Sequence, residues 1–335
     1  MIKTFTDILK IKYLKKSIPL YCHWEVTFRC NLRCPFCTLQ SGKNIWQPEL
    51  TTIEAIDILK QVKDMGSKII HFVGGEPTIR NDLDELAELA KQYKMMTMIT
   101  SNGYVKNINT LKKIDLVRIS LTRKIDKKSN IGLNPVETLE ELVLAGKTPS
   151  ITTTISTETK DSDIDFILGL ARRLKIKVGF YYVDVGLSHL NCFSPTDLEK
   201  RKEELQHLII PRNEVLEKIN NLYTKNKDVV LNQNRFFQMI KKGGLSKYGC
   251  RAMDTAICIK ANGQIAMPCI EFPHKTPKGK LSEVYNSTCA KECRKEQGEY
   301  WFCKECGMSC MYSASTLLSI IELFSTVKKY IKQII

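Results

Sequence analysis

Between residues 22 and 184 the chain alternates short runs of β-branched and aromatic residues with segments whose apolar residues recur at helical spacing. The runs predict strands near 22–28, 68–73, 95–100, 115–121, 149–157 and 176–184, and the segments between them predict helices near 53–65, 81–93, 105–113, 135–145 and 161–174. Such alternation is typical of βα units whose strands form one parallel sheet. A chain of 335 residues with 43% hydrophobic content can bury one large core. We therefore predict an α/β fold, a partial (β/α)6 barrel with a smaller appended region.

Three cysteines follow the first predicted strand at a C-x3-C-x2-C spacing, Cys30, Cys34 and Cys37. Iron–sulfur clusters normally take four cysteine thiolates, so three ligands would leave one iron open to a ligand that the protein does not supply. A zinc site is the alternative, but zinc sites more often combine two Cys or Cys/His pairs to reach four ligands. The spacing therefore favours an iron–sulfur cluster with one open iron.

Polar and glycine-rich turns follow the next three predicted strands. Gly74, Gly75, Glu76 and Pro77 come after the second, Ser101 and Asn102 after the third, and Ser120 at the end of the fourth. Each turn alone has an ordinary explanation, because glycine and asparagine are common in turns. However, the carboxyl ends of parallel strands meet at one rim of a barrel, and active sites lie there. Together with the cysteines, these turns predict a binding site at that rim.

This set of motifs resembles the radical S-adenosylmethionine (SAM) superfamily, which implies a partial TIM barrel. The resemblance implies that Cys30, Cys34 and Cys37 hold a [4Fe–4S] cluster whose fourth iron is chelated by the amino and carboxylate groups of SAM. The glycine turn resembles the GGEP element that binds the SAM amino group, and residues 101–103 resemble the polar element near the SAM carboxylate or ribose. Phe36 stands where the family usually has an aromatic residue beside the adenine.

Three further positions resemble the family less closely. Ser120 matches a family strand end that reads Ser-Leu-Asp, but Thr122 replaces the aspartate. Thr153, at the centre of the run 152–154 on the fifth strand, is a candidate for a ribose contact. Glu25 and Thr27 match the ExT pattern that often precedes the first cysteine, for which we expect a structural role.

The chain has thirteen cysteines, and eight of them lie near the C-terminus: Cys250, Cys258, Cys269, Cys289, Cys293, Cys303, Cys306 and Cys310. Asn262 and Gly263, between two apolar runs, predict a tight hairpin that brings flanking cysteines together. The region resembles the SPASM or twitch extension of radical SAM enzymes, which carries auxiliary [4Fe–4S] clusters, although its spacings depart from the usual pattern. We expect two auxiliary clusters rather than one, the first including Cys250, Cys258 and Cys269, with structural zinc as the alternative.

These patterns divide the chain into five parts. We expect a basic amphipathic segment over 1–20, the barrel over 21–186, a helical connection over 187–248 with one long helix from Asp197 to about Tyr223, the auxiliary-cluster region over 249–312, and an amphipathic helix over 313–335. Either terminal segment can pack on the body, or lie on a membrane with its lysines toward anionic head groups.

The resemblance implies an enzyme that cleaves SAM reductively to a 5′-deoxyadenosyl radical, which then abstracts hydrogen from a substrate. We expect a peptide or protein side chain as the substrate, and an electron donor such as ferredoxin or flavodoxin. Two alternatives stay open: modification of a membrane lipid, and a non-catalytic zinc or electron-transfer protein. The net charge of +15 permits an anionic partner, but no basic–aromatic stripe indicates nucleic acid.

The expected location is the cytoplasm, with peripheral membrane contact as an alternative. Residues 1–16 have no apolar core or cleavage site of a secretion signal, and no stretch reaches the roughly 18 apolar residues of a membrane span. In a reducing compartment the thiols would stay available to metal.

Overall fold

A computed structural model describes residues 2–14, 16–39, 48–125, 132–187, 190, 193–231, 234–241 and 250–306. Its centre is a seven-stranded parallel sheet in the order β6-β5-β4-β3-β2-β1-β7. The strands are β1 (Tyr21–Thr27), β2 (Ile69–Gly74), β3 (Met96–Ser101), β4 (Leu116–Ser120), β5 (Ser150–Ile155), β6 (Lys177–Tyr182) and β7 (Ala256–Ile259). The six predicted strands are all present, and the partial barrel is confirmed.

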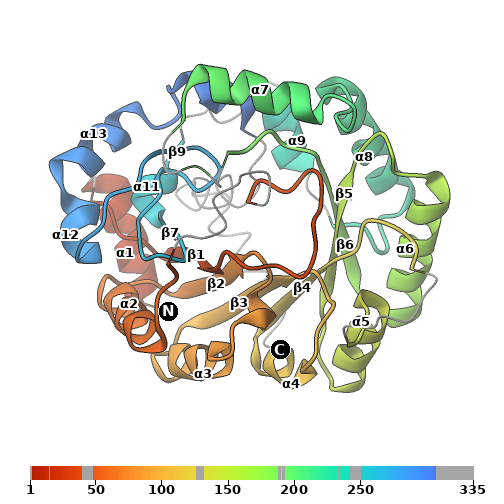
Figure 1. Ribbon diagram of the computed structural model, residues 1–335, viewed down its shortest axis with the longest axis horizontal. Helices are drawn as coiled ribbons and strands as arrows, with labels where there is room; N and C mark the ends of the chain where they lie inside the picture. Colours follow the sequence, from red (N-terminus) through yellow and green to blue (C-terminus); the bar gives the residue numbers. More distant parts are fainter. Residues whose placement is uncertain are drawn as a thin grey trace.

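One helix follows each of the first five strands, on the outside of the curved sheet (Figure 1). These helices are α2 (Thr52–Asp64), α3 (Leu83–Gln92), α4 (Ile108–Lys113), α5 (Pro135–Leu144) and α6 (Asp161–Leu174). Local sequence sets where they begin: Thr51 and Asn134 cap α2 and α5, and each forms a capping box with a glutamate three residues on.

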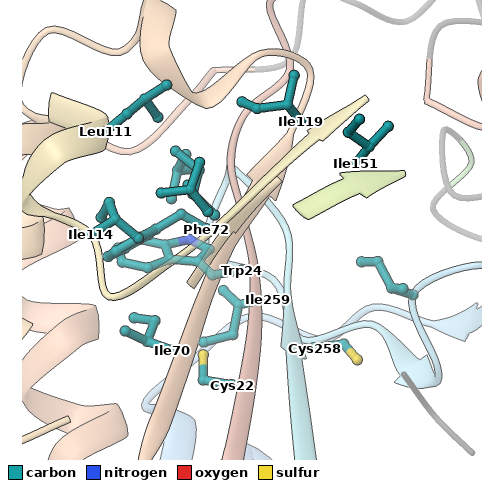
Figure 2. Packing of buried hydrophobic residues seen from close by; sticks show 14 of the residues in the cluster. Cys22, Trp24, Ile70, Phe72, Leu111, Ile114, Ile119, Ile151, Cys258 and Ile259 are labelled. Carbon is teal, nitrogen blue, oxygen red and sulfur yellow. The ribbon is translucent and has the colours of Figure 1, made fainter. Parts of the chain in front are cut away.

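The main hydrophobic core lies between the sheet and these outer helices. Alternation along β1 and β2 sends Trp24 and Phe72 to the helix side, where both are fully buried and pack with Ile259 of β7 (Figure 2). The opposite face of β1 carries His23 and Glu25, so the barrel interior is lined with polar groups. This division leaves the inner face of the sheet for chemistry.

The seventh strand comes from the C-terminal region that the sequence analysis treated as separate from the barrel. It pairs with β1 in parallel, from Tyr21 with Ala256 to Trp24 with Ile259. The opposite edge is extended as well, because Val230 forms a bridge with Val178 of β6. Segments beyond residue 187 therefore complete both edges of the barrel.

The prediction of a single long helix from Asp197 to about Tyr223 is wrong. The structure has two helices instead, α7 (Pro195–Leu205) and α8 (Arg212–Lys225). Pro211 lies between them, and the residue before a proline is disfavoured in helical conformation. A further helix, α9 (Asn234–Lys241), packs near α8. Figure 1 shows α7 spanning the opening of the barrel.

The predicted C-terminal hairpin is present. Ile259 bridges Ile265 in antiparallel fashion, and the turn contains Gly263 with a φ of 80°. The remaining elements are short: α11 (Ala252–Thr255), β8 (Met267–Pro268), β9 (Pro273–Lys275), α12 (Leu281–Asn286), α13 (Thr288–Glu296) and the 3-10 turn η2 (Trp301–Glu305). A small antiparallel sheet joins β8 and β9.

The N-terminal amphipathic segment forms α1 (Ile2–Tyr13) and packs on the body. Ile8 and Ile11 are buried in a small cluster with Leu20. The amphipathic helix expected over 313–335 lies outside the described residues. Within the described part of the chain, none of the helices combines the length and apolar character needed to cross a membrane.

Candidate cluster and cofactor site

The cysteine loop is held against the end of β2 by backbone hydrogen bonds. The amide of Gly75 donates to the carbonyl of Thr27 at 2.8 Å, and the amide of Glu76 donates to the carbonyl of Arg29 at 2.8 Å. A Cβ at Gly75 would overlap the Arg29 carbonyl group, and Gly74 has a φ of 125°. The two glycines are therefore required for this close approach of loop and strand, in addition to any role toward a ligand.

Glu76 joins the second rim turn to the third. One oxygen of its buried carboxylate accepts from the hydroxyls of Ser101 at 2.9 Å and Thr78 at 2.7 Å, and the other accepts from the amide of Asn102 at 2.6 Å. Burial raises the pKa of Glu76, and these hydrogen bonds act in the opposite direction. Pro77 is buried and begins a 3-10 turn, η1 (Pro77–Ile79), that Glu76 caps.

Asn102 joins the third turn to the first cysteine. Its side-chain amide donates to the Asn31 side-chain oxygen at 2.7 Å and lies 3.8 Å from the Cys30 sulfur. The amide of Leu32 donates to the same sulfur at 3.4 Å. Burial raises the pKa of Cys30, whereas these two donors lower it. Hydrogen-bond donors around a sulfur are what an iron-bound thiolate requires, so this environment fits a cluster ligand.

Two arginines approach the other cysteines of the loop. Burial raises the pKa of Cys34, and the charge of Arg123, just beyond β4, lowers it. Arg201 of α7 is only 4% exposed, and its guanidinium donates to the carbonyl of Cys37 at 3.2 Å. Sequence reasoning missed both arginines and Asn31. Only the position of Asn31, directly after the first cysteine, gave a signal.

Other predicted cofactor residues have different surroundings. Ser120 is half-buried at the end of β4. Thr153 is completely buried on the same side of β5 as Ile151, and its hydroxyl donates to the Leu121 carbonyl at 2.8 Å. The ribose contact expected of Thr153 is therefore wrong, because strand alternation turns its neighbours, not Thr153, toward the interior. Phe36 is half-buried and packs against a second hydrophobic cluster that contains Phe272.

The described C-terminal cysteines fall into two groups. Burial raises the pKa of Cys269 well above its ordinary value, and the nearby charges of Cys306, Cys258 and Cys303 raise it further. Burial, and then the charge of Cys250, raises the pKa of Cys303 to about 11. The three cysteines predicted for a first auxiliary cluster are thus joined by two from η2 and its end.

The second group is Cys289 and Cys293, one helical turn apart on α13. Burial raises the pKa of Cys293, a hydrogen bond with Tyr300 lowers it, and the charge of Cys289 raises it again. Cys310 lies outside the described residues. Across the described residues, no three His, Cys, Asp or Glu side chains are gathered closely enough to hold a single metal ion.

A set of charged side chains lies close to the cysteine loop. Glu25 of β1 lies near Lys260, the residue that follows β7. The Lys260 charge lowers the pKa of Glu25, whereas the Glu271 charge raises it. Burial is the larger effect and raises the pKa of Glu25 to about 8. The pKa of Glu271 is raised to about 7 by burial and then by Asp184, against a hydrogen bond from Thr38. This charged group was not anticipated from sequence.

Sequence comparison finds similarity over about 30% of the chain. The Fe-coproporphyrin III synthase of Methanosarcina barkeri is 38% identical over 97 residues, which is 29% of this chain and 24% of that protein. The 7,8-dihydro-6-hydroxymethylpterin dimethyltransferase of Methanocaldococcus jannaschii is 36% identical over 108 residues, 30% of this chain and 20% of that protein. The match therefore spans about a quarter or less of the length of these relatives.

Structural comparison extends over most of the chain. The Streptococcus suis protein SuiB, solved with its precursor peptide SuiA, has a TM-score of 0.62 at 21% identity, over 91% of this chain and 74% of SuiB. Native anSMEcpe with bound AdoMet has a TM-score of 0.57 at 14% identity, over 92% of this chain and 100% of that one. At these low identities, the two likenesses show that the chain shares the fold of these proteins.

A family profile identifies the segment that carries the rim motifs. Residues 24–126 match the Radical SAM superfamily, and they contain Cys30, Glu76 and Asn102, the residues joined in one hydrogen-bond network. Members of this superfamily bind a [4Fe–4S] cluster and SAM. This match, together with the barrel and the network at its rim, identifies residues 24–126 as a radical SAM domain.

Proposed function

We propose that this protein is a radical SAM enzyme that modifies a peptide or protein side chain, with Cys30, Cys34 and Cys37 as ligands of the SAM-binding cluster. The observation that carries the proposal is the network from Glu76 through Asn102 to the Cys30 sulfur. It fixes two rim turns relative to the first cysteine, as a site for one cluster and one chelating ligand requires.

The role of the chain's own residues is to bind the cluster and SAM and to orient them. When bound, the cluster and SAM supply reductive cleavage of the carbon–sulfur bond and a 5′-deoxyadenosyl radical that takes hydrogen from the substrate. Donors from Leu32 and Asn102 stabilise the Cys30 thiolate, and Arg201 fixes the backbone of Cys37. Arg123, close to Cys34, is suited to an anionic group such as the SAM carboxylate.

The C-terminal cysteines would hold auxiliary clusters. We assign Cys250, Cys258, Cys269 and one or both of Cys303 and Cys306 to the first, and Cys289 and Cys293 to a second. Each group has donors suited to thiolates: the amide of Ala252 lies 3.5 Å from the Cys250 sulfur, and Tyr300 hydrogen-bonds Cys293.

A peptide substrate is supported by the extent of the structural likeness. SuiB was solved with a precursor peptide, and anSMEcpe has also been solved with a Cp18Cys peptide at a TM-score of 0.52. These likenesses cover 91% and 93% of this chain. A ferredoxin or flavodoxin would supply the electron.

The test is anaerobic loading with iron and sulfide, followed by incubation with SAM and dithionite. The loaded protein should release 5′-deoxyadenosine, and separate Cys30→Ala, Cys34→Ala and Cys37→Ala variants should reduce the release to background while retaining auxiliary iron. Cys22→Ala, in the buried core behind the sheet, is the control and should still release it. Intact SAM in the unmodified protein, or unchanged release by the three variants, would refute the proposal.

A further inference from the structure

Beside the cysteine loop, the barrel interior holds a group of acidic side chains together with Lys260. Glu25, Glu271 and Asp184 contribute three carboxylates that act on one another or on Lys260, the cation that acts on Glu25. Lys260 is nearly completely buried, and its ammonium donates to the Leu190 carbonyl at 2.8 Å. Three acidic side chains are thus gathered with this lysine, in a chain whose net charge is +15.

Two carboxylate oxygens in this group have no partner. Among the described residues, Oε2 of Glu25 and Oε2 of Glu271 are buried without a hydrogen bond, and Glu25 as a whole is only 4% exposed. Buried carboxylate oxygens are normally paired, because leaving one unpaired costs roughly 1–3 kcal/mol. Both oxygens are therefore suited to a donor that arrives with a ligand.

Neighbouring residues hold the two carboxylates in place. Alternation along β1 directs Glu25 to the interior side, near Lys260, which directly follows the neighbouring strand β7. The Thr38 side chain hydrogen-bonds Glu271, and the Glu271 carboxylate lies against Gly186, where a Cβ would overlap its Oε2. Gly186 has no positive φ, so the closeness of this carboxylate is a reason for glycine there.

The group also adjoins both proposed cluster sites. Thr38 directly follows Cys37 of the SAM-binding loop, and Glu271 follows two residues after Cys269 of the first auxiliary group. A substrate group held here would therefore be adjacent to both proposed cluster sites.

We propose that Glu25 and Glu271 bind a cationic group of the substrate, an ammonium or a guanidinium, and thereby select a basic peptide side chain. This rests on the proposed function, whose substrate class it narrows. The cation would donate hydrogen bonds to the two unpaired oxygens and favour the ionised form of both carboxyl groups. Charge-assisted bonds of this kind are about twice as strong as neutral ones and fix orientation as well as affinity.

The test measures binding to cluster-loaded protein with SAM and without reductant, so that no turnover occurs. The probes are capped pentapeptides that are identical except for lysine, arginine or norleucine at the centre, titrated by calorimetry. We expect a cationic peptide to bind about tenfold or more tightly than the norleucine peptide, and Glu25→Gln or Glu271→Gln to reduce that ratio about tenfold. Glu85→Gln, exposed on outer helix α3, should leave the ratio unchanged.

A second variant tests the position of the carboxylate rather than its charge. Gly186→Ala should displace Glu271 and reduce the preference for the cationic peptide, and the same change in a Glu271→Ala background should have no further effect on it.

Iron per chain shows that each variant has folded. The inference is overturned if both cationic peptides bind within about threefold of norleucine, or if their preference survives Glu271→Gln. Release of 5′-deoxyadenosine, measured separately, tests the proposed function independently of this result.

Discussion

Gly75 is the residue at which the cysteine loop comes closest to the end of β2, and the closeness depends on the missing side chain. Gly75→Ala should push the loop away from the strand and reduce iron bound at Cys30, Cys34 and Cys37, with loss of most 5′-deoxyadenosine release. Iron analysis and product chromatography measure both effects. Gly169→Ala on α6 has open space around it and should keep iron, with stability raised by about 0.5–1 kcal/mol from helix propensity.

Glu76 needs two accepting oxygens, since three donors meet one and the Asn102 amide meets the other. Glu76→Gln keeps the shape but places an NH2 group opposite one set of donors. We expect a loss of about 2–4 kcal/mol in the free energy of unfolding, together with weaker SAM binding. Anaerobic unfolding and SAM titration measure these, and equal stability of Glu76→Gln and Glu85→Gln would contradict the role of the carboxylate.

His23 makes stability depend on pH. Burial lowers its pKa from 6.5 to about 4, and its Nδ1 is buried without a hydrogen-bond partner among the described residues. A lowered pKa means that the stabilising contribution is fully present above pH 6.5 and is lost as the pH falls toward 4, by about 3 kcal/mol in all. His23→Gln should therefore flatten the acid side of a plot of melting temperature against pH, whereas exposed His207→Gln should not.

Some residues of the candidate site could be predicted from the sequence, and others could not. Cys30, Glu76 and Asn102 were identified because each follows a strand in a motif with a known spacing. Arg201 and Glu271 were not, since each acts on a segment far away in the sequence and nothing near either residue indicates its partner. Thr153 was assigned to the interior because the strand was predicted without its inside–outside register.

At the scale of elements, the strands and outer helices were predictable because apolar spacing and caps act locally. Thr51 and Asn134 each begin a helix within a residue of the expected start. The division between α7 and α8 was missed because their charged surfaces give one continuous helical pattern, and only Pro211 interrupts it.

Helix α7 has a role toward the cluster site that its charged sequence conceals. Its buried Arg201 supports the carbonyl of Cys37, so Arg201→Met should leave the chain folded but allow a chelator to remove iron from the loop several times faster. Visible absorbance during chelation measures the rate. Exposed Lys200→Met, one residue away, should release iron at the unmodified rate, and equal rates in the two variants would exclude this role for Arg201.

At the scale of the whole molecule, β7 makes the barrel and the C-terminal region one folding unit. A chain that ends at residue 249 would leave β1 as an exposed edge, and the backbone groups that pair with β7 in the full chain would be open to other chains. We expect this shortened chain to aggregate, while the full chain stays dispersed, as light scattering would show. A dispersed shortened chain with native circular dichroism would mean that β7 is dispensable for the barrel.

The pairing of β1 with β7 also has a consequence during synthesis. Trp24 and its neighbour Ile259 are separated by about 235 residues, so at roughly 5–20 residues per second the ribosome delivers the second strand some 10–50 s after the first. For that interval one side of β1 has no neighbour. The sheet of the nascent chain is therefore incomplete until β7 has been synthesised. A chaperone that covers the β1 edge during this interval would raise the yield of folded protein.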